Sequence, residues 1–242
     1  MVKKICMFGD SIAKGVIIDE ARGRYAGTKR SFANIISEAE PWISLKNYSM
    51  LGCTVSKGQS LLARHLADVQ DCDLVVLEYG GNDSDHNWAE VASSPESAHL
   101  PKTPIGSFAE IYQEIIDVLR DMGKKIVMLN LPPIHSNKYF AWFGGGLDRG
   151  SILQWLGGSE DAIFKFHEKY NSCVCKLAAE NDVPLVDIRS AFLKLPDYSD
   201  YLCADGIHPN EAGHQLIARV ISENIPGLTK LFAPLPMAVS CV

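Results

Sequence analysis

The sequence contains no long hydrophobic run and no excess of positive charge. No uncharged apolar stretch approaches the roughly 18 residues that a membrane span needs, and residues 5–8, which follow Lys3 and Lys4, are shorter than the core of a signal peptide. The 23 Lys and Arg residues are outnumbered by 29 Asp and Glu, which gives a net charge of −6. The composition therefore predicts a cytoplasmic protein without membrane insertion, and it disfavours binding to nucleic acid.

Cysteines at metal-ligand spacing are also missing. Of the seven cysteines, only Cys173 and Cys175 lie close together, and no second pair accompanies them. A chain of 242 residues can bury a large enough core to fold without disulfides. We therefore expect free thiols, no metal and no cofactor.

Short apolar runs alternate with stretches of helical periodicity. The apolar runs that indicate buried parallel strands are residues 4–8, 43–48, 74–79, 126–131 and 184–188. The helical stretches are residues 32–38, 61–69, 108–122, 162–181 and 211–223. Because parallel strands need crossover connections, the alternation predicts an α/β fold, a three-layer α/β/α sandwich with a central five-stranded parallel sheet. We expect one domain over residues 1–242.

Two segments interrupt the alternation, near residues 84–107 and 135–158. The first contains Pro95, Pro101 and Pro104 and is expected to be too irregular for a helix. The second is rich in aromatic residues, namely Tyr139, Phe140, Trp142, Phe143 and Trp155. Both follow predicted strand ends, where open α/β sheets bind ligands, so both should stand around the site. The aromatic segment is either a substrate wall, a contact in a homo-oligomer or a local hydrophobic core.

A serine follows the first predicted strand, in Gly9-Asp10-Ser11-Ile12. A hydroxyl at a strand-to-helix turn is exposed near backbone N–H groups, which suits a nucleophile. Taken alone, the tripeptide is also ordinary turn and N-cap chemistry. The Gly-x-Ser-x-Gly elbow is absent, because position 13 is alanine.

An acid and a histidine lie three residues apart near the other end, in Asp205-Gly206-Ile207-His208. A carboxylate at this spacing can hold the imidazole by its Nδ1–H and leave Nε2 free to take a proton from a serine. Asn210 is a plausible N-cap of the last helix. A capped loop with a solvated histidine would have the same pattern.

Candidate oxyanion donors follow two further strands. Gly80-Gly81-Asn82-Asp83 ends the third strand and offers the amide of Asn82, and Gly52 follows the second strand and offers a backbone N–H. A turn glycine is the default interpretation of Gly52. Asp10 and Asp83 adjoin these positions and are expected to form hydrogen bonds within the loops.

Together, these four segments resemble the SGNH hydrolases, also called the GDSL-type esterase and lipase superfamily. The resemblance spans residues 5–210, with Ile12 in place of the usual leucine. It implies a flavodoxin-like sandwich in which Ser11, Asp205 and His208 form the catalytic triad. It also implies an oxyanion hole made by the N–H of Ser11, the N–H of Gly52 and the amide of Asn82.

The resemblance predicts a serine-dependent carboxylic ester hydrolase with a small-molecule ester as substrate. Aromatic insertions that could stack on sugars favour an O-acetyl or other small acyl ester of a carbohydrate, and the alternative is a lysophospholipase or thioesterase for longer acyl chains. A non-catalytic binding module of the same fold remains open. A flavin or nucleotide binder is disfavoured, because the loop after the first strand has few glycines and an acid where phosphate would lie.

Several other side chains are candidates for substrate contact. Those in the aromatic insertion are Trp142, Phe143 and His135, and the remaining histidines of the insertions are His86 and His99. By contrast, His65, His167 and His214 lie in predicted helices and are expected to pack or to face solvent.

Overall fold

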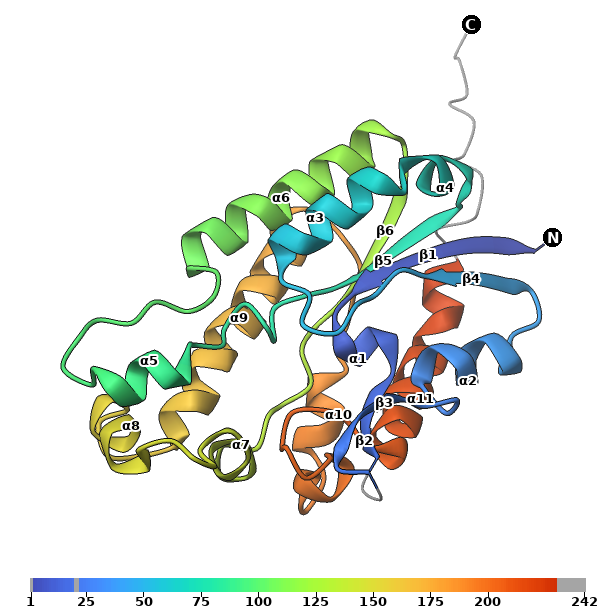
Figure 1. Cartoon of the computed structure of the whole chain (residues 1–242). Coiled ribbons are helices and arrows are strands. Elements are labelled where there is room, and N and C mark those ends of the chain that lie inside the picture. Colours follow the sequence, from blue (N-terminus) through green and yellow to red (C-terminus); the bar gives the residue numbers. More distant parts are fainter. Residues whose placement is uncertain (1, 20–21, 230–242) are drawn as a thin grey trace, which may run out of the picture.

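A parallel sheet lies between two layers of helices (Figure 1). The computed structural model describes residues 2–19 and 22–229. The sheet strands are β1 (Lys3–Gly9), β4 (Ile43–Asn47), β5 (Leu74–Glu78), β6 (Lys125–Leu129) and β7 (Leu185–Val186). Their order is β4-β1-β5-β6-β7 and all neighbours pair in parallel. The predicted five-stranded sandwich is confirmed, with the strand order of the flavodoxin-like folds.

Side chains alternate between two hydrophobic cores, one on each face of the sheet. Along β1, Cys6 and Phe8 enter one core, whereas Ile5 and Met7 enter the other. This period of two is what a strand buried on both faces requires, and it explains why the strands are recognisable as continuous apolar runs.

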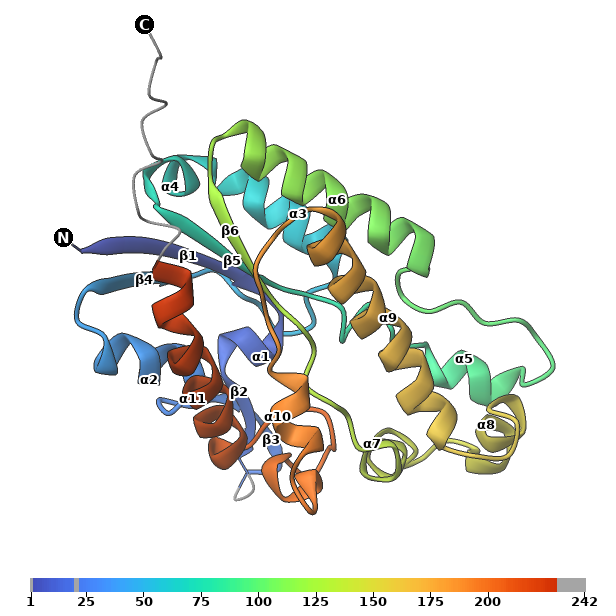
Figure 2. The ribbon, with the colours of Figure 1, turned by 180° about the vertical axis from the view of Figure 1, so that it is seen from behind.

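Helices cover both faces of the sheet (Figures 1 and 2). The first core is closed by α3 (Val55–Arg64), α4 (Leu66–Asp71), α6 (Ile105–Asp121) and α9 (Asp161–Glu180). The second is closed by α1 (Ser11–Lys14), α2 (Phe32–Ala39), α10 (Arg189–Leu193) and α11 (Glu211–Leu228). The helix expected at residues 61–69 is in fact two helices that meet at His65.

The first insertion corrects a prediction. Residues 84–107 were expected to contain no helix, yet α5 (Trp88–Ser93) lies there and α6 begins at Ile105. The prolines are compatible with both helices because of where they fall. Pro95 comes after the end of α5, and Pro104 immediately precedes α6, where a missing N–H costs nothing.

The aromatic insertion forms two short helices, α7 (Ser136–Phe143) and α8 (Arg149–Trp155). Both pack with α5 and the start of α9 around a third hydrophobic cluster, separate from the two cores of the sheet. The buried members of this cluster are Trp88, Val91, Ile134, Phe140, Ile152, Leu156 and Ile163. The alternative of a local hydrophobic core is thus confirmed for this segment, whereas the homo-oligomer contact stays a prediction.

A pair of strands near the N-terminus was not predicted from the sequence. Strands β2 (Val16–Asp19) and β3 (Arg24–Gly27) form an antiparallel pair outside the main sheet.

Within the described part of the chain, no helix combines the length and the apolar character needed to cross a bilayer. Cys173 and Cys175 lie on α9, and neither forms a disulfide.

Candidate active site

Ser11 is the first residue of α1 and directly follows the turn out of β1. Gly9 makes this turn possible, because a Cβ there would lie 2.7 Å from the Cβ of Ala13 and 2.8 Å from the carbonyl oxygen of Glu78. Asp10 caps the helix, since its Oδ1 accepts a hydrogen bond from the N–H of Ile12 at 2.8 Å. The hydroxyl of Ser11 is thus held at the carboxyl end of a central strand.

Asp205 and His208 share one tight loop in front of α11. The Oδ1 of Asp205 accepts hydrogen bonds from the N–H groups of Ile207 and His208, both at 3.1 Å. The Asp205 carboxylate thereby stabilises the loop to which it belongs. Gly206 supplies the positive φ of 71° that the turn needs. Asn210 caps α11 by accepting from the N–H of Gly213 at 3.0 Å, as expected from the sequence.

These segments bring three side chains into one hydrogen-bonded chain. Nε2 of His208 lies 2.8 Å from Oγ of Ser11, and Nδ1 lies 2.5 Å from Oδ2 of Asp205. All three residues are buried. Burial works to raise the pKa of Asp205, but hydrogen bonds from the His208 ring and from two backbone N–H groups hold that pKa below its usual value. Asp205 is therefore a carboxylate at neutral pH and fixes the imidazole.

The three residues that carry the candidate oxyanion donors, Ser11, Gly52 and Asn82, line one cavity. The N–H groups of Ser11 and Gly52 donate no hydrogen bond to any other described residue. Asn82 donates one N–H to Oδ2 of Asp10 at 3.0 Å, which leaves its second N–H for another acceptor. The structure therefore brings together all the residues that the sequence analysis grouped as an oxyanion hole.

Two buried carboxyl groups lie beneath these donors. Glu78 is fully buried, and its Oε2 accepts a long hydrogen bond of 3.4 Å from the N–H of Asp10. Burial, and then the charge of Asp10, raise the pKa of Glu78 well above its usual value. Burial likewise raises the pKa of Asp10. Because two adjacent carboxylates repel each other in a buried site, the pair favours retaining one proton.

Asp83 forms hydrogen bonds across the loops, as expected. Its two carboxylate oxygens accept from the N–H of Val55 at 3.0 and 3.1 Å, at the start of α3. Thr54, the residue in the N-cap position, forms no side-chain cap of its own. Asp83 therefore ties the end of β5 to the helix that follows Gly52.

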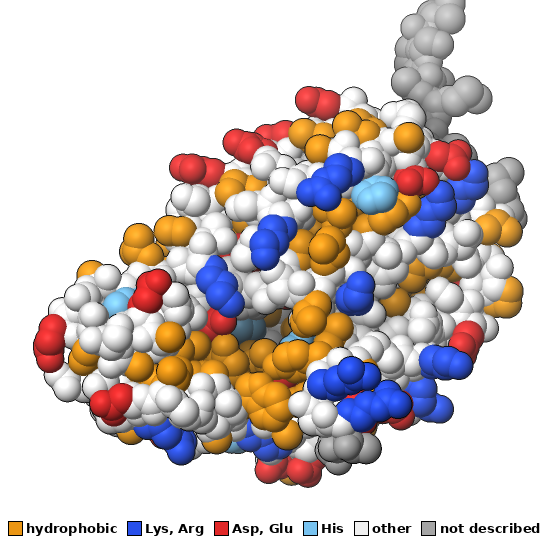
Figure 3. Space-filling view, viewed as in Figure 1, with side chains coloured by type: hydrophobic (Ala, Val, Ile, Leu, Met, Phe, Trp, Pro, Cys, Tyr) orange, Lys and Arg blue, Asp and Glu red, His pale blue; other side chains and the backbone are white. Residues whose placement is uncertain are grey.

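A cavity of about 420 Å³ opens beside Ser11. Figure 3 shows it as a hollow bordered by hydrophobic side chains, with histidine visible inside. Most of the side chains that border it are apolar or aromatic, and the aromatic ones come from β3, α5, α7 and α9: Tyr25, Trp88, Tyr139, Trp142, Phe143 and Phe166. A volume of this size is typical of pockets that enclose a small molecule.

The aromatic rings of the cavity differ in how much face they leave open. Trp88 and Phe143 stack on each other, with centroids 4.3 Å apart and an interplanar angle of 11°. Trp142 is 41% exposed and lies 6.3 Å from the ring of Tyr25, which in turn lies 4.9 Å from the ring of His208. Burial, and then the charge of Asp205, raise the pKa of Tyr25 to about 12. The cavity thus has a closed aromatic wall and an open aromatic rim.

The structure separates the candidate substrate contacts. Trp142 and Phe143 line the cavity, whereas His135 does not. The imidazole of His135 instead caps α7, because its Nδ1 accepts a hydrogen bond from the N–H of Lys138 at 3.3 Å. His86 lines the cavity, and His99 does not.

Several cavity residues were missed by the sequence analysis. Tyr25 belongs to the unexpected strand β3, so no signal pointed to it. Trp88 lies five residues beyond the end of the Asn82-Asp83 motif, and that proximity could have suggested it. Phe166 and His167 follow the helical pattern of α9, in which a cavity-lining side chain looks the same as a core side chain. Within residues 2–19 and 22–229, no three His, Cys, Asp or Glu side chains gather as they would around a metal ion.

A serine hydroxyl, an imidazole and a carboxylate joined in this order have the arrangement of a catalytic triad in an α/β protein. Residues 7–216 match the model of the GDSL-like lipase/acylhydrolase family, and the chain belongs to this family.

Curated relatives are found in plants. The chain is 23% identical over 150 residues to the GDSL esterase/lipase WDL1 of Oryza sativa subsp. japonica, which covers 61% of this chain and 51% of that protein. It is 25% identical over 157 residues to the GDSL esterase/lipase CPRD49 of Arabidopsis thaliana, and this match covers 62% of this chain and 54% of that protein. The chain thus spans about half the length of the curated relatives it matches.

Solved structures share the fold. A lipase/acylhydrolase from Enterococcus faecalis superposes with a TM-score of 0.66 at 20% identity, over 94% of this chain and 97% of that one. The acetylxylan esterase Axe2 from Geobacillus stearothermophilus superposes with a TM-score of 0.62 at 22% identity, over 92% of this chain and 94% of that one.

Proposed function

We propose that this protein is a serine-dependent carboxylic ester hydrolase. The observation that carries the proposal is the continuous chain from Ser11 Oγ to His208 Nε2 and from His208 Nδ1 to Asp205, at 2.8 and 2.5 Å, in the lining of a cavity. Membership of the GDSL-like lipase/acylhydrolase family supports it.

The geometry supports a two-step acyl transfer. His208 takes the proton of Ser11 as Oγ forms a bond to the ester carbonyl carbon, and the carbonyl oxygen becomes an oxyanion near the N–H groups of Ser11, Gly52 and Asn82. The carbon–oxygen bond to the alcohol then breaks, and the imidazolium gives its proton to the departing oxygen. Water, deprotonated by His208, repeats the sequence on the acyl-enzyme and releases the acid and Ser11.

For the substrate, we propose an O-acetyl or other small acyl ester of a carbohydrate. The open rim formed by Trp142 and Tyr25 supports this, because these side chains are 41% and 37% exposed and an exposed aromatic face can stack on a sugar. The fold shared with an acetylxylan esterase is compatible with it.

Longer acyl chains are a second candidate, favoured by a different observation. The cavity of about 420 Å³ is much larger than an acetyl group, and most of the side chains that border it are apolar or aromatic. An apolar chain would remove this surface from water. Initial rates on nitrophenyl esters from acetate to octanoate, set against acetate release from acetylated xylo-oligosaccharides, separate the two candidates.

Covalent labelling tests the activity itself. A fluorophosphonate should add one adduct to the wild-type chain by intact mass, and Ser11→Ala should abolish both the adduct and nitrophenyl acetate hydrolysis. Ser60→Ala, which removes an exposed hydroxyl on α3, is the matched control and should behave as wild type. A folded wild-type protein with neither adduct nor turnover would contradict the proposal and favour a binding module.

A further inference from the structure

Two buried histidines, His86 and His167, line the cavity in addition to His208. They are 6% and 3% exposed, and neither belongs to the chain of hydrogen bonds that includes Ser11. Buried polar groups in proteins nearly always have hydrogen-bond partners, so a buried imidazole nitrogen that lacks one in the lining of a cavity points to a ligand.

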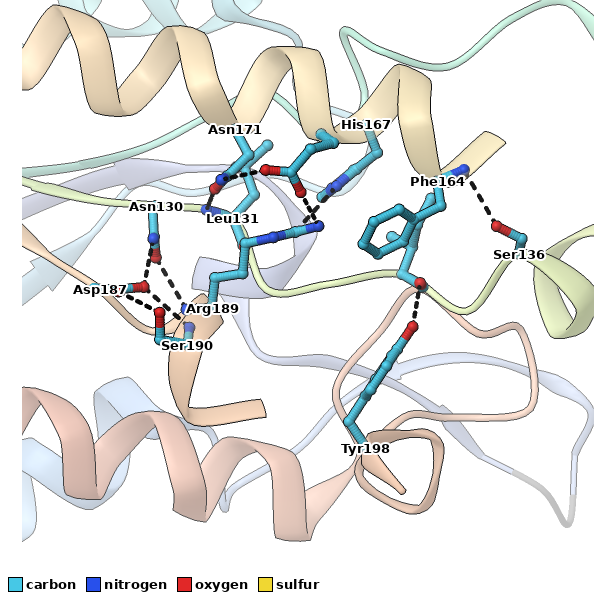
Figure 4. A network of polar contacts seen from close by, with 12 residues as sticks. Asn130, Leu131, Ser136, Phe164, His167, Asn171, Asp187, Arg189, Ser190 and Tyr198 are labelled. Atoms are coloured by element: carbon cyan, nitrogen blue, oxygen red, sulfur yellow. Dashed lines mark hydrogen bonds and ion pairs between the residues drawn. The ribbon is translucent and has the colours of Figure 1, made fainter. Parts of the chain in front are cut away.

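Arg189 fixes the orientation and the tautomer of His167. Its Nη1 lies 3.5 Å from Nδ1 of His167, and the pair is joined by a dashed line in Figure 4. A guanidinium can only donate, so Nδ1 must be the acceptor. Burial, and then the charge of Arg189, lower the pKa of His167 to about 3. The ring is therefore neutral at physiological pH, and its single proton is on Nε2.

Arg189 is itself held in place on several sides. It donates through Nη1 to the carbonyl oxygen of Leu131 at 3.2 Å, and Nη2 forms an ion pair with Glu168. Its guanidinium also lies over the ring of Phe164, 5.0 Å from the centroid. A donor fixed in this way behind Nδ1 polarises the imidazole and strengthens the N–H on the opposite nitrogen.

The Nε2–H of His167 remains available. Nε2 donates to no other described residue, and His167 lines the cavity. His167 therefore presents one directional N–H donor to an otherwise largely apolar space.

His86 provides a second imidazole with the same property. Its ring lies among Trp88, Trp155 and Phe166, at centroid distances of 5.5, 5.1 and 5.1 Å. Burial lowers the pKa of His86, so it too is neutral at physiological pH. Its Nδ1 is buried without a partner, and a proton there would be an unsatisfied donor. The proton is better accommodated on Nε2.

The charges around the cavity determine which acceptor would fit. Among the described residues, the acidic side chains that line it are Asp10 and Asp85, and no Lys or Arg lines it. Lys102 is paired with Asp85 at 2.7 Å, and Arg189 with Glu168. An anionic ligand would therefore find no unpaired cation in the lining to balance its charge, whereas a neutral oxygen needs only an N–H donor.

We propose that His167, assisted by His86, forms a polar subsite that selects esters carrying a neutral oxygen acceptor in the group that enters the cavity. A hydroxyl, ether or carbonyl oxygen has the required chemistry. The proposal rests on the ester hydrolase function proposed above. It makes His167 a specificity-determining residue, because leaving its N–H unpaired against an all-carbon chain costs free energy that an oxygen acceptor recovers.

Matched pairs of esters test the subsite. In one arm, nitrophenyl heptanoate is compared with analogues in which an ether oxygen replaces each chain methylene from C3 onward in turn. In the other, heptyl acetate is compared with analogues that carry the ether oxygen at each position of the alcohol from C3 onward. The arm that responds identifies whether the acyl or the alcohol group occupies the cavity.

The expected readout is the ratio of kcat/KM between the best ether analogue and its all-carbon parent. This ratio should fall about 10-fold or more in His167→Leu and less in His86→Leu, while hydrolysis of the all-carbon parent persists. His99→Leu, which removes an imidazole that does not line the cavity, should keep the wild-type ratio. An unchanged ratio in His167→Leu would overturn the proposal.

A measurement without substitution of His167 keeps the question decidable if His167→Leu does not fold. In Ser11→Ala labelled with ¹⁵N-histidine, the Nε2–H resonance of His167 should shift on addition of the best ether analogue and stay in place with the all-carbon ester. Equal responses to the two esters would overturn the subsite. If the wild type hydrolyses no ester at all, the hydrolase proposal fails, and the titration of Ser11→Ala still tests the subsite.

Discussion

The amide of Asn82 donates a hydrogen bond to the carboxylate of Asp10, with 3.0 Å between Nδ2 and Oδ2. The other oxygen of the same carboxylate caps α1 by accepting from the N–H of Ile12. One side chain therefore positions both the turn that carries Ser11 and the amide that faces it. Ser11 and Asn82, the proposed nucleophile and one proposed oxyanion donor, are therefore positioned by one hydrogen-bonded unit.

Asn82→Ala should lower kcat by about 100- to 1,000-fold with a smaller change in KM, because the amide matters most when negative charge develops on the substrate oxygen. Steady-state kinetics on nitrophenyl acetate, together with a thermal melt, measure this. A variant that melts earlier but keeps a near-normal kcat in its folded fraction would make Asn82 a turn residue only.

Asp10→Asn should lower kcat by about 10-fold, less than Asn82→Ala, because an asparagine can still cap α1 but has one acceptor oxygen to share between Ile12 and Asn82. The effects of the two substitutions should not add in the double variant, since both act on the same amide. Additive losses would show that Asp10 acts on catalysis independently of Asn82.

Gly206→Ala should destabilise the protein and reduce kcat together. A Cβ at this position would lie 2.6 Å from the Cβ of Lys138 and 2.7 Å from the carbonyl oxygen of His135, and φ is 71°. Gly123→Ala is the matched control, because its φ of 69° is similar but its surroundings are open. The control should cost about 1 kcal/mol and leave kcat unchanged, whereas Gly206→Ala should cost more than about 2 kcal/mol. Urea unfolding and kinetics compare them, and equal costs would contradict the tight fit.

His214 should make the protein sensitive to acid. It is fully buried, and its Nδ1 accepts a long hydrogen bond of 3.5 Å from the N–H of Phe32. Burial, and then the charge of His208, lower its pKa from 6.5 to about 4. Below pH 6.5 the unfolded chain therefore takes up the proton first, and the stability present above that pH is lost as the pH falls to 4.

Comparison with His214→Gln isolates this contribution, because glutamine retains an acceptor but does not titrate. The difference in free energy of unfolding between wild type and variant should shrink by about 3 kcal/mol between pH 7 and pH 4. Groups that titrate equally in both proteins cancel in the difference. Parallel curves over this range would contradict the buried neutral state of His214.

Trp142→Ala should change substrate choice more than catalytic competence. Loss of the exposed rim face should reduce kcat/KM on acetylated xylo-oligosaccharides by roughly 5- to 100-fold, with little effect on nitrophenyl acetate. Leu100→Ala, which removes a highly exposed side chain outside the cavity lining, is the control. Equal losses on both substrates would contradict the rim role, and a change of molar mass in solution without a change in selectivity would instead indicate an oligomer contact.

The parts of the fold that could be predicted are those in which local pattern and burial coincide. The central strands are apolar on both faces, so their residues form continuous apolar runs. Ser11, Gly52 and Asn82 lie just beyond strand ends, whereas Asp205 and His208 lie in the loop before the last helix. Strands β2 and β3 could not be found in this way, because β3 (Arg24–Gly27) is largely exposed and carries no apolar alternation. Tyr25 was therefore missed with its strand.

The wall of the cavity was harder to predict for a related reason. His167 is buried on α9 with the spacing of a core residue, and only the three-dimensional position of Arg189 and of the cavity distinguishes it from packing. For His135, the prediction of a substrate contact was wrong. The residue lies in the aromatic insertion, but it immediately precedes α7, and its ring accepts a hydrogen bond from the N–H of Lys138 instead of lining the cavity.

The two ends of helix α7 contact different parts of the site. At one end, the N–H of His135 donates to the carbonyl oxygen of Gly206 at 2.7 Å, which holds the loop between Asp205 and His208 against the start of the helix. At the other, Trp142 and Phe143 border the cavity. For directed evolution this divides the helix into a portion to diversify and a portion to leave alone. Libraries at positions 142 and 143 can explore new substrates, whereas randomising positions 135 and 138 would displace the loop that holds His208 in most clones.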